Sequence, residues 1–180
     1  GATRLAHEAN GLTKVGAPHV PAVLERGALL GFFYLVLEYL PSETLADSLL
    51  DPLPMTLPRF GELASSILRS VEAIHGAGIV HRDLKPENIF IDAAGGAKIV
   101  DFELAKDERS GSEILSTVEA GTPEYMSPEQ CDGLSDADPR SDIYSLGVLF
   151  YEMLCGAPPF FGKTGEVREA QRSRRPAPLW

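Results

Sequence analysis

Residues 81–88, with the sequence HRDLKPEN, constrain this 180-residue chain more than any other segment. Within it, the carboxylate of Asp83 is suited to accept a proton from an attacking hydroxyl group. The positive charge of Lys85 is suited to neutralise negative charge on a phosphoryl group. Asn88 and, a short distance further on, Asp101 supply oxygen ligands of the kind that Mg²⁺ prefers. These residue types in this order indicate phosphate and metal chemistry.

The residues around this segment predict how it is presented. Gly76 and Gly78 end a helical pattern, so residues 81–88 are expected to form a loop. Apolar runs at 89–91 and 98–100 predict two short strands, with a turn between them. A hairpin of this length brings Asn88 and Asp101 close together at its open end.

These motifs resemble the signature of the eukaryotic-type protein kinases. HRDLKPEN followed by Asp101-Phe102 is similar to their catalytic loop and metal-binding motif. Residues 121–129 (GTPEYMSPE) and 142–147 (DIYSLG) resemble later segments of bacterial members of the family. The resemblance runs from about residue 8 to residue 179.

This resemblance implies an α+β, two-lobed protein-kinase-like fold that is incomplete at both ends. Residues 1–40 are expected to be a remnant of the small lobe and the hinge. Residues 41–180 are expected to form the first part of the mainly helical large lobe. The glycine-rich loop and the lysine of the third strand, which the family places upstream, precede the first residue of this sequence.

The resemblance also implies a reaction, the transfer of the γ-phosphoryl group of ATP to serine or threonine hydroxyls of a protein substrate. Asp83 would orient and deprotonate the hydroxyl, and Lys85 would stabilise the transferred charge. Asn88 and Asp101 would hold Mg²⁺. Thr122 together with Lys85 is typical of members directed to serine and threonine.

The expected nucleotide site follows from the same resemblance. Residues 35–40 are similar to the fifth strand and hinge of the family, with Leu37 as the gatekeeper. Glu38 would offer its backbone carbonyl to adenine, and Leu40 its N–H and carbonyl. The full set of residues expected to contact or organise the nucleotide is Leu37, Glu38, Leu40, Phe90, Asp101 and Glu8. Glu8 lies on a predicted helix over 5–15 and would pair with the upstream lysine, although a solvated helix charge is the alternative.

Two features concern regulation. Glu103 stands where the family has glycine, and because glycine permits backbone conformations that glutamate resists, we expect a restricted or impaired enzyme. The polar segment 107–119 corresponds to the activation loop and contains Ser110, Ser112, Ser116 and Thr117. One hypothesis is that Ser116 or Thr117 becomes phosphorylated and orders the loop by contacts with Arg82.

Composition limits the class of partner and compartment. A formal net charge of −10 argues against a nucleic-acid or anionic-membrane surface. No run of eighteen apolar residues predicts a membrane segment. Cys131 and Cys155 lie far apart without a metal-ligand pattern, which favours a reduced, cytoplasmic protein over a disulfide-bonded one. The oligomeric state stays open.

The remaining patterns predict individual elements. Apolar spacing predicts core helices over 60–75 and 141–154, and a short helix is expected over 44–50. Strands are expected over 20–24 and 32–39, with a turn at 25–27 between them. The C-terminal residues 168–180 are interpreted as a solvated linker or a partner site. His75 is interpreted as a cap or a packed side chain, and Asp142 is expected to hold the backbone of the catalytic loop.

A different class of function stays open beside the enzyme. A truncated or degenerate kinase that acts as a non-catalytic binding module, or an inactive fragment, fits the upstream gap and Glu103. The presence of Asp83, Lys85, Asn88 and Asp101 favours the enzyme, because an idle descendant has no physical need for all four.

Overall fold

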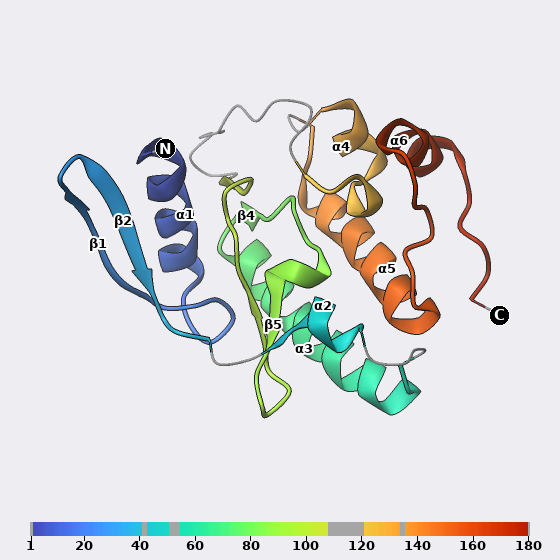
Figure 1. Cartoon of the computed structure of the whole chain (residues 1–180), viewed down its shortest axis with the longest axis horizontal. Helices are drawn as coiled ribbons and strands as arrows, with labels where there is room; N and C mark the ends of the chain where they lie inside the picture. Colours follow the sequence, from blue (N-terminus) through green and yellow to red (C-terminus); the bar gives the residue numbers. More distant parts are fainter. Residues whose placement is uncertain (1, 41–42, 51–54, 108–120, 134–135, 180) are drawn as a thin grey trace.

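A computed structural model shows a small lobe and a larger, mainly helical lobe (Figure 1). It describes residues 2–40, 43–50, 55–107, 121–133 and 136–179, with side chains described from residue 5. The two-lobed α+β fold expected from the sequence is confirmed. None of the helices in this described part of the chain is long and apolar enough to cross a membrane.

The small lobe consists of one helix beside a two-stranded hairpin. Helix α1 spans Ala2–Val15, and strands β1 (Val23–Leu29) and β2 (Phe32–Leu37) pair antiparallel. Figure 1 shows α1 lying against the hairpin. The buried side chains of Ala9 and Leu12 lie one turn apart on α1, as the helical spacing predicted.

The turn predicted at 25–27 is wrong, because these residues lie within β1. The chain turns instead at Leu30 and Gly31, both with positive φ (52° and 83°), as a two-residue hairpin turn requires. Gly27 is opposite Tyr34 in the strand register, and a Cβ atom on it would lie 2.6 Å from the Tyr34 hydroxyl oxygen. Gly27 therefore permits a close cross-strand approach and does not mark a turn.

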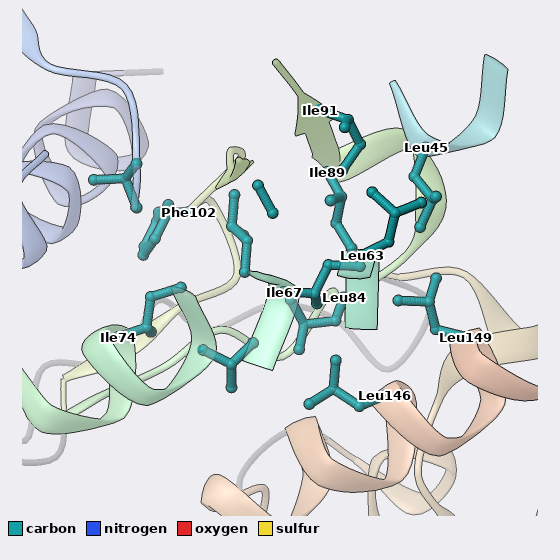
Figure 2. Close-up of a cluster of buried hydrophobic side chains, with 14 of the residues drawn as sticks. Leu45, Leu63, Ile67, Ile74, Leu84, Ile89, Ile91, Phe102, Leu146 and Leu149 are labelled. Atoms are coloured by element: carbon teal, nitrogen blue, oxygen red, sulfur yellow. The ribbon is translucent and has the colours of Figure 1, made fainter. Parts of the chain in front are cut away.

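The large lobe is built on two long helices. Helices α3 (Leu57–Gly76) and α5 (Pro139–Cys155) pack against each other and confirm the two predicted core helices. Figure 2 shows that Ile67 and Ile74 of α3, Leu146 and Leu149 of α5, and Leu84 and Ile89 of the segments between them meet in one buried cluster. This core fixes the loop that contains residues 81–88.

Short strands complete the frame of that loop. β5 (Ile89–Ile91) and β6 (Ala97–Ile99) form the predicted hairpin, and β3 (Glu43–Thr44) adds to its edge. β4 (Ile79–Val80) pairs with β7 (Lys106–Asp107). The short helix α2 (Leu45–Ser48) begins at Thr44, whose hydroxyl caps it.

The C-terminal part contains a helix that the sequence interpretation missed. The 3₁₀ turns η1 (Pro86–Asn88) and η2 (Pro123–Tyr125) are followed along the chain by α4 (Pro128–Asp132). Helix α6 spans Thr164–Ser173 and packs against α4 and η2, so the first residues of the predicted linker are helical. Val167, Ala170 and Gln171 form its buried side.

Candidate catalytic site

Asp83 lies at the centre of a group of polar side chains. Lys85 Nζ is 3.0 Å from Asp83 Oδ2 and also donates a hydrogen bond to Thr122 Oγ1 at 3.2 Å. The side chains of Asp83 and Lys85 are 10% and 20% exposed, so both are accessible yet restrained. The structure therefore brings together three of the residues that the sequence singled out.

Asn88 joins the same group through its amide nitrogen. Asn88 Nδ2 donates to the backbone carbonyl of Asp83 at 2.9 Å and to Asp83 Oδ2 at 3.1 Å. Since both bonds use the nitrogen, the amide oxygen of Asn88 is left as the atom suited to a metal ion.

Asp101 is placed beside Asn88 by the β5–β6 hairpin. The backbone N–H of Val100 donates to the Asn88 carbonyl at 3.0 Å, which ties together the two ends of the hairpin. Asp101 has a φ of 65°, a strained conformation for a non-glycine residue that is often found at functional sites. An amide oxygen and a carboxylate at the end of one hairpin fit an ion that takes a few protein ligands and completes its shell with phosphate and water.

A buried carboxylate holds the loop from below. Asp142, fully buried on α5, accepts hydrogen bonds from the backbone N–H groups of His81 and Arg82 at 2.9 and 2.8 Å. Its Oδ2 atom also lies 2.7 Å from Nε2 of His75. Asp142 thus holds the loop backbone as predicted, and His75 supports this carboxylate from α3.

Aromatic packing connects the loop to the small lobe. The rings of His81 and Phe102 meet edge to face, with centroids 4.9 Å apart. Phe102 is fully buried, and Gly11 of α1 approaches it so closely that a Cβ atom would lie 3.0 Å from the ring. The position of α1 is therefore coupled to the segment that contains Asp101.

Glu8, also on α1, lies near the acidic end of that segment. Partial burial raises the pKa of Glu8, and the negative charges of Asp101 and Glu103 raise it further. A carboxylate in this setting favours a cation nearby, as the expected pairing with a lysine requires.

A family model described as the protein kinase domain matches residues 2–177. This chain belongs to the protein kinase family. Its catalytic-loop geometry is consistent with the motif order that the family requires.

Curated relatives of this kinase chain come from bacteria. It is 40% identical to the serine/threonine-protein kinase PknL of Mycobacterium tuberculosis over 161 residues, which are 89% of this chain and 40% of PknL. It is 38% identical to PknB of the same species over 165 residues, covering 88% of this chain and 26% of PknB. A probable serine/threonine-protein kinase of Corynebacterium efficiens is 33% identical over 167 residues, which are 89% of this chain and 25% of that protein. The chain therefore spans less than half the length of these relatives.

The residues expected at the nucleotide of this kinase lie on the hinge side of the large lobe. Leu37 ends β2 and packs against the core, and Leu40 is half-buried just beyond it. Phe90 lies on β5, opposite Lys98 of β6. Glu38 donates its backbone N–H to Ala22, while its side chain contacts Lys98.

Glu103, the departure from the family pattern, adopts an ordinary backbone conformation. Among the described non-glycine residues, positive φ occurs at Leu30, Arg82 and Asp101, so glycine is not required at position 103 in this state. The Glu103 N–H donates to Asp101 Oδ1 at 3.3 Å, and its side chain is exposed.

The predicted phosphorylation sites Ser110, Ser112, Ser116 and Thr117 lie outside the described residues. Arg82, their expected partner, is buried and donates from Nε to the carbonyl of Leu104 at 2.6 Å. The guanidinium is thereby held at the start of the activation segment.

Sequence reasoning missed two buried glutamines that support the site. Gln130 donates from Nε2 to the carbonyl of Arg82 at 2.7 Å, and its Oε1 accepts from the N–H of Ser127. The Ser-x-x-Gln spacing of 127–130 is a capping-box signal and would have placed Gln130 at a helix start. Gln171 contacts η2 from α6, and its local sequence gives no such signal.

Proposed function

We propose that this chain is the catalytic part of a serine/threonine protein kinase. The proposed reaction transfers the γ-phosphoryl group of ATP to a serine or threonine hydroxyl of a protein substrate. The observation that carries the proposal is the convergence of Lys85 and Asn88 on the carboxylate of Asp83, at 3.0 and 3.1 Å. Residues 1–40 would serve as the small-lobe and hinge part, and 41–180 as the first part of the large lobe.

Each residue has a role that its contacts support. Asp83 orients the acceptor hydroxyl and takes its proton. Lys85 is placed to stabilise charge on the transferred group, and Thr122 restrains the lysine by accepting its hydrogen bond. Asn88 and Asp101 are the proposed magnesium ligands, and Mg²⁺ when bound supplies charge neutralisation at the phosphates.

The nucleotide would lie between the hinge and β5. Glu38 and Leu40 offer backbone groups to adenine, and Leu37 and Phe90 supply apolar contacts on either side of it. Glu8 would pair with a lysine cation that helps to hold the phosphates. The raised pKa of Glu8 supports this role, because a buried carboxylate without a cation is costly.

Binding of Mg²⁺-ATP, measured by calorimetry, tests the nucleotide site directly. We expect heat of binding that requires Mg²⁺ and that disappears in the Asp101→Asn variant. Binding of equal strength with and without Mg²⁺ would contradict the assignment of the metal ligands. Transfer from labelled ATP to serine peptides is then expected to be lost in Asp83→Asn while Mg²⁺-ATP binding persists.

A non-catalytic binding module is the second candidate, favoured by the apolar surface of the small lobe. Leu24, Leu29, Phe32 and Phe33 of the β1–β2 hairpin are all more than half exposed. Such a patch is typical of an interaction surface. A folded full-length protein that fails to bind Mg²⁺-ATP would favour this candidate over the enzyme.

A cytoplasmic location is part of the main proposal. The two cysteines are not bonded to each other, with Cys131 buried and Cys155 exposed. Free thiols of this kind are typical of a reducing compartment. ATP as the phosphoryl donor is consistent with the same location.

A further inference from the structure

The side chain of Gln171 is buried where helix α6 meets η2. It is 3% exposed, and its Nε2 atom donates to the carbonyl of Glu124 at 2.6 Å and to that of Pro123 at 3.2 Å. Its Oε1 atom accepts from the hydroxyl of Tyr144 on α5. One amide group thus joins three elements that are far apart in the sequence.

This use of a polar side chain needs a reason beyond packing. Burying an amide costs free energy unless its donors and acceptor are satisfied, whereas a leucine would fill the same space without that requirement. Val167 and Ala170 already provide apolar contact on the same face of α6. What Gln171 adds is a fixed position for the backbone of η2.

The held segment borders the proposed catalytic residues. Thr122, directly before η2, accepts the hydrogen bond from Lys85, which contacts Asp83. The carbonyl of Tyr125 is held by Ser145 at 2.7 Å. The carbonyls of all three residues of η2 are therefore anchored to α5 or α6.

A peptide that presents a hydroxyl to Asp83 must pass along the same segment. Residues 121–125 are half-buried, so they leave part of their surface facing outward next to Lys85. The shape and position of this wall decide which side chains fit beside the acceptor hydroxyl.

We propose that Gln171 is a positioning residue that sets the affinity and the residue preference for the protein substrate. This inference rests on the proposed kinase function. Gln171 acts through the backbone of η2 and does not touch ATP or the reacting atoms. Its loss is therefore expected to change recognition of the peptide while nucleotide binding is unaffected.

Steady-state kinetics of the full-length protein with Mg²⁺-ATP and a peptide library with one central serine test this. In Gln171→Leu we expect the KM for peptide to rise about tenfold, since two backbone acceptors lose their donors. The KM for ATP and the slow hydrolysis of ATP by water should stay at the wild-type level, and the preference for residues flanking the serine should weaken. Glu166→Gln, exposed on the same helix, is the matched control and should behave as wild type.

Several outcomes separate this inference from its alternatives. An unchanged peptide KM and preference in a folded Gln171→Leu protein would overturn it. A proportional fall in peptide transfer and ATP hydrolysis would also overturn it, because that is the mark of a general structural defect. If Gln171→Leu does not fold, Tyr144→Phe decides, since it keeps the amide but removes the donor that orients it. A peptide KM that rises two- to threefold in Tyr144→Phe would support the inference, and an unchanged one would overturn it. Absence of Asp83-dependent transfer in the wild type would instead refute the kinase function itself.

Discussion

The carboxylate of Glu38, just after β2, lies 2.5 Å from Nζ of Lys98 on β6. Glu38 also accepts a hydrogen bond from the backbone N–H of Ala22 at 3.1 Å. The hydrogen bond from Lys98 lowers the pKa of Glu38, so the carboxylate is ionised at neutral pH. This pair joins the hinge to the hairpin whose ends carry Asn88 and Asp101.

If the pair positions the hinge, its two residues should act as a unit. We expect Glu38→Gln and Lys98→Met each to weaken Mg²⁺-ATP binding about threefold, and the double variant to be no weaker than the single ones. Calorimetric titration of the three variants measures this coupling. Asp138→Asn, which breaks the Asp138–Arg140 contact far from the hinge, serves as the control. Effects that add in the double variant would show that the two residues act independently.

Two helical glycines should respond oppositely to alanine. In Gly61→Ala the new Cβ meets open space, so the higher helix propensity should stabilise the protein by about 0.5–1 kcal/mol. In Gly11→Ala it meets the buried ring of Phe102 at 3.0 Å, and the crowding should outweigh that gain and destabilise the protein by about 1 kcal/mol. Urea unfolding of both variants measures the difference. Equal stabilisation by the two substitutions would show that Phe102 moves aside freely.

The sequence predicted those parts of the structure that depend on neighbouring residues. The hairpin from β5 to β6 is marked by apolar runs on either side of Gly95 and Gly96, so the approach of Asn88 to Asp101 followed from local pattern alone. The stripe of apolar residues on α3 predicted a core helix in the same way. The roles of Asp83, Lys85 and Asn88 came from the family motif, and their contacts agree with it.

Features that depend on distant residues were not predictable in this way. Gly27 was interpreted as a turn because no local signal reveals that Tyr34 must pass close to it. Helix α6 was missed because its buried side contains two apolar residues and Gln171, whose burial makes sense only against η2 and Tyr144. His75 likewise bonds to Asp142, which lies 67 positions further along the chain.

The stability contributed by Glu152 should depend on pH. Partial burial raises its pKa, and the charge of Glu87 adds to the effect, although the hydrogen bond from Tyr125 opposes it. Because the folded state holds the proton more tightly than the unfolded state, stability falls as pH rises from the ordinary value of 4.5 through the raised value. Glu152→Gln should therefore gain stability relative to the wild type between pH 4 and pH 7. Urea unfolding at both pH values measures this, with Glu166→Gln as an exposed control; an advantage that shrinks as pH rises would contradict the sign.

The anchoring of the catalytic loop by Asp142 gives the largest expected effect on stability. In Asp142→Asn, the amide nitrogen would face one of the N–H donors of His81, Arg82 or the His75 ring, and one buried donor would lose its charged acceptor. We expect a loss of about 2–4 kcal/mol in the free energy of unfolding, with faster hydrogen exchange at the backbone amides of His81 and Arg82. Asp132→Asn tests the same change at an exposed carboxylate paired with Arg172, where the expected loss is below about 1 kcal/mol. Slow exchange at His81 and Arg82 in Asp142→Asn would mean that the core formed by Leu84 and Ile89 holds the loop without this carboxylate.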